Sequence, residues 1–385
     1  MTVTQIATLL NTAYAQTTGL TDHPVNEDLS NVVDLGTTVF NSAWKDNFVK
    51  NMIDQIGKMV FVDRPYTGYA PSVLKSDWEY GSIMAKAQTK DFEAVDNPSW
   101  ALTPGQTVNQ FEYNPPEVTQ KFYNKRESWQ IECSFAERQA KSALRDAAQA
   151  GQFFNMIEST IDSSRRYNID NLIMRTYNNF MANKINGNNG VIDVLANYNR
   201  LYNQSLTAEY AFVDDKFLRF LAFTVLDIKD MLKVKSHAFN MGATGYTKST
   251  PADRLHVVLN SLYGRATEIF MMADTYHDDL TKFGSYETVP FWQASSKPAL
   301  PTSYEARTAI DVNIDALDPP TRVQQHWIIG ILHDDDAIAV NNTDMRVTSA
   351  YNANGEYYNN FYKCDTNCLN DLTENGVILI CGSGN

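Results

Sequence analysis

The chain has 385 residues, and its 32 basic and 45 acidic side chains give a formal net charge of −13. A compact monomer of this mass exposes roughly 15,000 Å², so the length supports a substantial core and two or three domains or subdomains. The acidic balance and the lack of a long basic run exclude a general grip on nucleic-acid phosphates. A hydrophobic share of 43% argues against wholesale disorder.

The apolar runs are short, and the longest of them, such as 327–332, fall well below the ~20 residues of a membrane-spanning helix. The first ten residues lack the cationic start and apolar stretch of a secretory signal, so we expect none. Four cysteines are too few for a disulfide framework of this size, which predicts reduced thiols in a cytoplasmic setting. The 20 Tyr, 19 Phe and 6 Trp favour either an aromatic-rich core or protein interfaces.

The N-terminal region predicts two helices. Residues 2–16 carry apolar side chains on one helical face, and Ser30 is a candidate cap for a second helix. In that second helix Phe40, Trp44 and Phe48 recur at four-residue spacing. A single stripe of this kind needs a partner surface, so the unit is expected to pack on the body or on a neighbouring subunit.

Residues 63–117 change character, because Pro, Gly, Thr, Asp and Gln interrupt them repeatedly. Short strand-like pieces lie around 79–87 and 107–113, and no apolar set is dense enough to form a core. The pattern predicts an extended hairpin or long loop. Loops of this length inside a compact domain are usually functional or bind something.

Residues 118–135 predict a strand, in which Trp129, Ile131, Cys133 and Phe135 alternate with polar residues. The sequence 134–137 matches a capping box, so a helix is expected from there to about residue 184, with an interruption at Gly151. The run 186–190, rich in Asn and Gly, ends that helix.

The rest of the chain predicts alternating helices and strands. Helices are expected at 214–235 and 263–273, and strands at 255–259, 326–332, 337–340 and 377–381. Residues 294–321 are rich in Pro and are expected on the surface, 334–336 predict a turn, and 352–355 predict a hairpin turn. Together these elements predict an α+β fold.

Three motifs could carry chemistry. Residues 242–249 resemble a phosphate-binding loop superficially, but Thr247 stands where such a loop needs glycine, which favours a surface loop. Residues 277–279 and 333–336 each join a histidine to aspartates and could in principle hold a divalent cation, but a solvated turn is the favoured interpretation, because aspartate favours turns. Cys364, Cys368 and Cys381 lack the two-residue spacing of zinc sites and are expected to be structural thiols. No catalytic set emerges.

The order of elements resembles the major capsid proteins of tailed bacteriophages. Residues 251–260 are similar to the axial-domain strand and helix start of that family, 286–292 to a segment of the same region, and 327–340 to its late strand. The resemblance implies an α+β shell-protein fold with an N-arm, an extended E-loop hairpin, a peripheral domain with a long spine helix, and an axial α/β domain.

Mapped onto this chain, the resemblance implies an N-arm at 1–62, an E-loop at 63–117, a peripheral domain at 118–190, an axial domain at 191–325, and C-terminal strands at 326–385 that complete both sheets. It implies a structural protein, not an enzyme, without cofactor or metal. Nine aromatic residues of the arm and loop are the expected intersubunit contacts: Phe40, Trp44, Phe48, Trp78, Tyr80, Phe92, Trp100, Phe111 and Tyr113.

The implied partners are further copies of the chain, in pentamers and hexamers of an icosahedral or prolate head. Double-stranded DNA would be enclosed without sequence-specific binding, and assembly in the host cytoplasm would precede residence in the virion. Only a short arm precedes the E-loop, so a separate scaffolding protein and a portal are expected. The alternatives are an encapsulin-like compartment, another ring-forming or tube-forming virion protein, and a metal-dependent hydrolase that uses the His-Asp clusters.

Overall fold

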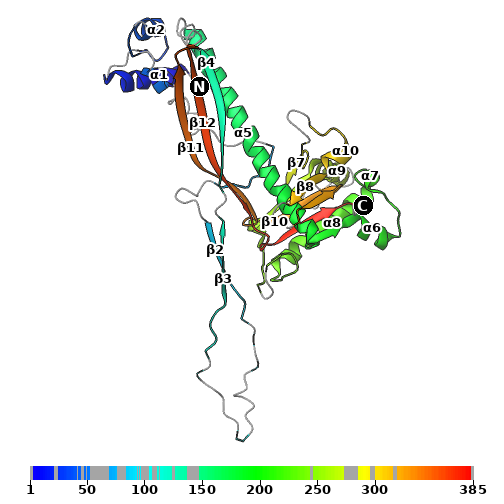
Figure 1. Ribbon diagram of the computed structural model, residues 1–385. Helices are drawn as coiled ribbons and strands as arrows, with labels where there is room; N and C mark the ends of the chain where they lie inside the picture. Colours follow the sequence, from blue (N-terminus) through cyan, green and yellow to red (C-terminus); the bar gives the residue numbers. More distant parts are fainter. Residues whose placement is uncertain are drawn as a thin grey trace.

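A long helix and a long sheet run side by side through the molecule and end at a second sheet that is covered by helices (Figure 1). This mixed architecture confirms the α+β class. The computed structural model describes residues 3–20, 25–40, 42–44, 47–48, 50–52, 69–75, 84–92, 94, 96, 104–105, 111, 113–123, 126–136, 147–242, 246–272, 285–294, 300–314 and 319–382.

The described helices fall into three groups: an N-terminal pair, one long helix and a set around the second sheet. In chain order they are α1 (Val3–Thr18), α2 (Val32–Phe40), α5 (Ala147–Asn186), α6 (Val194–Tyr202), α7 (Ala208–Ala211), α8 (Asp215–Lys233), α9 (Ser261–Met272) and α10 (Tyr304–Arg307). A short 3-10 helix, Ala252–Arg254, precedes the strand that leads into α9. None of the helices in the described ranges is long and apolar enough to cross a membrane.

The long sheet has the strand order β1-β11-β12-β4. Its strands are β1 (Leu74–Lys75), β4 (Arg126–Ala136), β11 (Ile338–Asn352) and β12 (Tyr357–Asn370). The turn between β11 and β12 confirms the predicted hairpin, because the Asn352 side chain accepts hydrogen bonds from the amides of Asn354 and Gly355.

The second sheet has the order β5-β13-β10-β6-β7, and two hairpins stand beside the sheets, β2-β3 and β8-β9. The remaining strands are β2 (Met84–Thr89), β3 (Val118–Tyr123), β5 (Val191–Asp193), β6 (Leu255–Asn260), β7 (Glu287–Val289), β8 (Ile310–Ile314), β9 (Thr321–Gln325), β10 (Ile328–Asp334) and β13 (Gly376–Ile380). Every residue of the central strand β10 is buried, as expected for a strand covered on both faces.

Helix α5 is a single 40-residue element, about 60 Å long at the usual rise per residue. The predicted interruption at Gly151 is wrong, because the helix passes through it. A helical glycine costs only about 1 kcal/mol, and the alanines at 147, 148 and 150 favour helix on its N-terminal side. The buried side chains of α5 face the long sheet and then the second sheet: Ile157, Ile161, Ile169, Ile173, Tyr177 and Phe180.

The capping box predicted at 134–137 is also wrong, since Ser134 lies inside β4 opposite Asn359 of β12. Its hydroxyl donates to the Asn359 side chain at 2.6 Å. Sheet pairing outweighs the local helix signal here, because Phe135 is buried beside Tyr358 in the same core. The described part of the long helix begins at Ala147, eleven residues after β4 ends.

The aromatic stripe of the arm is divided between two segments. Helix α2 ends at Phe40, and the amide of Ser42 donates to the Val39 carbonyl in a turn. Trp44 packs edge-on to Tyr14 of α1, and Phe48 is fully buried. The two N-terminal helices lie at the far end of the long sheet (Figure 1) and share one core with Tyr358 and Tyr362, so this unit packs on the body.

The expectation of a surface segment at 294–321 missed β8. Ile310 and Ile314 are buried in the core beside α5, and β8 pairs with β9 in register from Ile310↔Gln325 to Ile314↔Thr321. The alternation of Ile310, Val312 and Ile314 was the available signal, and the surrounding prolines obscured it.

Gly330 makes a close approach in the centre of the second sheet. A Cβ added there would lie 2.6 Å from the Val258 carbonyl oxygen and 2.5 Å from Leu259 Cδ2. We expect Gly330→Ala to lower the free energy of unfolding by about 2 kcal/mol, measured by urea denaturation. Gly242→Ala is the control, because its nearest contact would be an ordinary 3.4 Å; equal stability of both variants would contradict the packing argument.

Candidate assembly surfaces

The β2-β3 hairpin projects away from both sheets (Figure 1). Its strands pair antiparallel from Met84↔Tyr123 to Thr89↔Val118, and β3 is exposed along almost its whole length. An isolated two-stranded ribbon is marginally stable in water, so this hairpin depends on what holds its base and on what covers its surface.

Large apolar side chains of the hairpin lie open to solvent. The exposed fraction is 92% for Phe111, 84% for Tyr113 and 70% for Phe92. Three of the nine aromatic residues predicted as intersubunit contacts are therefore available on the surface. The whole chain exposes 21,363 Å², well above the roughly 15,000 Å² of a compact monomer of this mass.

The other predicted contact residues differ in their surroundings. Phe48 makes its contacts inside its own chain, and Trp44 is half-buried. Phe40 ends α2, but its side chain lies outside the described residues, as do Trp78, Tyr80 and Trp100.

Buried ion pairs fix the base of the hairpin. Lys86 Nζ lies 2.8 Å from Asp371 Oδ2 and 2.5 Å from Glu374 Oε1, in the turn between β12 and β13. Lys248 reaches the same Glu374 at 2.9 Å, and Lys121 of β3 lies 3.5 Å from Asp371. We call Lys86, Lys121, Lys248, Asp371 and Glu374 the base cluster.

Charges within the base cluster overcome the cost of burial. Burial opposes ionisation of Asp371, yet the Lys86 ammonium outweighs it and holds the pKa of this carboxyl well below its usual range. Burial likewise opposes the Lys86 ammonium, but Asp371 and Glu374 raise its pKa. Lys86 and Asp371 are therefore both charged at neutral pH, and each would be left buried without its counter-charge if the other were removed.

A second set of contacts joins the hairpin to the loop after α8. The Asp91 carboxylate accepts from Lys235 and from the Thr247 hydroxyl, and Thr119 of β3 shares a 2.6 Å hydrogen bond with Tyr246. Lys248 and Thr247 are thus occupied by carboxylates, which supports the interpretation of 242–249 as a surface loop. Residues 243–245 lie outside the described part.

The aspartates at 334–336 form the predicted turn and are matched by cations. Arg254 contacts Asp334 and Asp336, and Lys75 Nζ lies 3.0 Å from Asp335 and 3.3 Å from Asp336. These pairs connect β1 and the start of β6 to the end of β10. The other His-Asp motif, 277–279, lies outside the described residues.

His333 is buried next to this turn. Its Nδ1 lies 2.8 Å from the Asp334 carbonyl oxygen and must donate to it, so Nε2 accepts from the Tyr177 hydroxyl of α5 at 2.7 Å. Burial, with a smaller contribution from the His256 ring stacked at 5.2 Å, lowers the pKa of His333 to about 3. The imidazole is therefore a neutral link between the long helix and the second sheet.

No group of three His, Cys, Asp or Glu side chains within the described ranges could hold a metal ion. The four cysteines are free thiols. Burial raises the pKa of Cys381 to about 12, and it also raises the pKa of Cys133. The described parts of the predicted metal and thiol motifs thus form turns and core.

The helices around the second sheet also expose apolar surface. The outer side of α8 carries Phe223, 64% exposed, together with Leu226 and Met231, while its inner side is buried against β6 and β13. Tyr202 and Tyr210, on α6 and α7, extend this surface.

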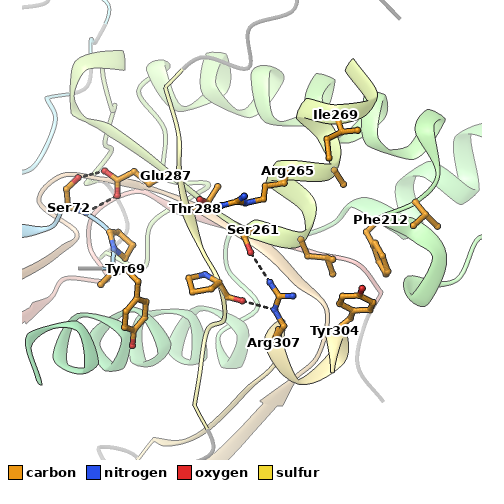
Figure 2. A pocket seen from close by; sticks show the side chains of 16 residues that line it. Tyr69, Ser72, Phe212, Ser261, Arg265, Ile269, Glu287, Thr288, Tyr304 and Arg307 are labelled. Carbon is orange, nitrogen blue, oxygen red and sulfur yellow. Dashed lines mark hydrogen bonds between the residues drawn. The ribbon is translucent and has the colours of Figure 1, made fainter. Parts of the chain in front are cut away.

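An open pocket of about 970 Å³ lies at the β7 edge of the second sheet. Figure 2 shows Phe212, Ile269 and Tyr304 at one end of it and Tyr69, Ser72 and Glu287 at the other. Two arginines line the pocket between these two ends, Arg265 of α9 and Arg307 of α10. Sequence reasoning found neither this pocket nor the base cluster.

Comparison with solved structures defines the class of fold. The chain matches the capsid structure of Staphylococcus phage Andhra with a TM-score of 0.50 and 9% identity, over 84% of this chain and 87% of that one. It matches a chain in the structure of the head fiber and inner core protein gp22 of native bacteriophage P68 with a TM-score of 0.52 and 10% identity, over 80% and 83%. A search of curated protein sequences found no match.

The family follows from the sequence itself. The model of the Phi29-like phage major capsid proteins matches residues 7–380, and the chain belongs to this family. It is a structural protein that self-assembles into a capsid shell and resides in the virion. This finding confirms the capsid resemblance and does not favour the encapsulin-like or hydrolase alternatives.

Removal of Lys86 tests the base cluster. Lys86→Ala leaves Asp371 and Glu374 buried with a missing counter-charge, so we expect a loss of about 3 kcal/mol in unfolding free energy and faster hydrogen exchange in β2 and β3. Lys90→Ala is the matched control on the same hairpin, because its pair with Glu117 is exposed and such pairs contribute less than about 1 kcal/mol. Equal effects of the two changes would contradict a buried clamp.

The neutral state of His333 predicts acid sensitivity. Its pKa is lowered in the folded chain, so the stability it contributes is complete above about pH 6.5 and is lost as pH falls toward about 3. Between pH 7 and 4.5 this costs about 3 kcal/mol. We expect His333→Asn, which keeps a donor for the Asp334 carbonyl, to show a flatter pH profile in urea denaturation. A profile as steep as that of the unaltered chain would contradict the neutral state of His333.

Proposed function

We propose that this capsid protein builds the pentamers and hexamers of an icosahedral or prolate head that encloses double-stranded DNA, and that assembly takes place in the host cytoplasm. In this proposal the chain has no catalytic activity, and it acts through the surfaces that contact neighbouring copies. A separate scaffolding protein and a portal are included as partners, on the strength of the family alone.

The exposed aromatic hairpin carries this proposal. Phe92, Phe111 and Tyr113 are 70%, 92% and 84% exposed, while ion pairs hold the base of the hairpin to the body. A neighbouring copy can bury these side chains at about 25 cal/mol per Å² of apolar surface. We therefore assign the hairpin as the E-loop, an extension that is held at its base and reaches a second copy.

We assign the other regions from the same resemblance to phage major capsid proteins. Residues 1–62 form the N-arm and 63–117 the E-loop, which contains β2. Residues 118–190 form the peripheral domain, which begins with the returning strand β3 and contains α5 as the spine helix. Residues 191–325 form the axial domain, and 326–385 complete the two sheets. The division is supported by two outer cores, one that joins the arm to the long sheet and one that packs α6, α8 and α9 on the second sheet. A third core lies along α5 and contains residues of both sheets.

Charge supports passive enclosure of DNA. A net charge of −13 repels phosphate overall, so an inner wall made from this chain would not adhere strongly to packed DNA. Sequence-specific contacts are not part of the proposal, because base recognition needs clustered donors that the chain lacks.

Shortening the hairpin tests the E-loop assignment. Replacing residues 92–116 with a four-residue Gly-Ser linker keeps β2, β3 and the base cluster, so we expect a folded subunit whose unfolding free energy changes by less than about 1 kcal/mol. Closed shells should be lost in negative-stain electron microscopy.

The matched control replaces exposed Tyr351 with Ser, outside the hairpin. This variant should still form shells under the same conditions, with the scaffolding protein co-expressed. Normal shells from the shortened chain would contradict the E-loop assignment, and a persistent monomer from the unaltered chain would contradict shell assembly by this chain.

A further inference from the structure

The pocket at the β7 edge has a mixed lining that its own chain leaves open. Ile269 and Tyr304 line it with exposed fractions of 64% and 52%, next to the ring of Phe212. Exposed apolar side chains gathered around a concave site are typical of a place where another molecule binds.

The two arginines of the pocket differ in their surroundings. Arg307 is held by the Pro290 carbonyl at 2.9 Å and by the Ser261 hydroxyl at 3.0 Å (Figure 2). Arg265 is exposed and lines the pocket from α9. A guanidinium of this kind is available to stack on an aromatic ring brought in from outside.

The hairpin supplies a complementary group. Phe111 and Tyr113 are the two most exposed large apolar side chains of the described chain, and Pro115 and Pro116 follow them. The prolines restrict the backbone of this strand-free segment, which lowers the entropy lost when it is bound. Aromatic rings then match both the apolar end of the pocket and the cation of Arg265.

One chain does not join these two sites by itself. In Figure 1 the hairpin runs downward from the end of the long sheet, whereas α7, α9 and α10, which surround the pocket, lie to the right beside the second sheet. A protrusion and a pocket at different places on the same chain define a heterologous contact, and repetition of such a contact gives a ring when its rotation closes.

We propose that the pocket lined by Phe212, Arg265, Ile269 and Tyr304 receives the aromatic side chains of Phe111 and Tyr113 from a second copy of this chain. The proposal rests on the proposed function, which it deepens by naming the acceptor of the E-loop. The cavity of about 970 Å³ is of the size that receives ligand-sized groups, so two rings can enter together.

Engineered disulfides test the contact in the full chain. We expect Phe111→Cys combined with Ile269→Cys to give covalent dimers on a non-reducing gel after oxidation, at least fivefold above the unaltered chain. The unaltered chain measures the background from its own four thiols. The matched control combines Phe111→Cys with Phe223→Cys on α8, because Phe223 and Ile269 are both 64% exposed.

The outcomes separate this contact from shell assembly, which is scored in the same samples by electron microscopy. Shells that crosslink through 111 and 269 support both proposals. Shells that crosslink through 111 and 223, or through neither pair, overturn the pocket and leave shell formation intact. Dimers crosslinked through 111 and 269 without shells uphold the contact but contradict the proposed function, and a monomer without crosslinks contradicts both.

Discussion

The ion pairs of Lys86 with Asp371 and Glu374 are the interaction on which the shape of this subunit depends. They join residues 285 positions apart and fix a ribbon that has no core of its own. Because Asp371 is fully buried, the pair resists screening by salt far better than a surface pair would. The hairpin can therefore project from the body with a defined direction and still leave its aromatic side chains uncovered.

A second buried network connects the long helix to the second sheet. Tyr177 of α5 donates to His333 of β10, and His333 donates to the chain at Asp334, where Arg254 and Lys75 match the acidic turn. The same residues that suggested a metal site therefore hold the two sheets in a fixed relation. Such rigidity suits a shell protein, since every copy must present its surfaces in nearly the same geometry.

The two networks hold the interior of the subunit together, while parts of its apolar surface stay exposed to solvent. Its exposed apolar surface lies on the hairpin, on the outer side of α8 and around the pocket at the β7 edge. If the chain buried all of these surfaces within itself, it would be a stable monomer with no apolar surface left for contacts in a shell. Leaving them for neighbours makes the free energy of assembly depend on aromatic contacts between copies.

The sequence by itself determined the elements with strong local patterns: α8, the strands β6, β10 and β13, the Asn-rich turn after β11 and the long exposed hairpin, because each is encoded by residues close together in the chain. It also carried the family. Only the tertiary structure decided that Ser134 joins a strand, that α5 passes through Gly151 and that Phe48 faces inward, since pairing with β12 and packing against distant strands override local signals. The base cluster and the pocket likewise exist only when the fold joins residues hundreds of positions apart.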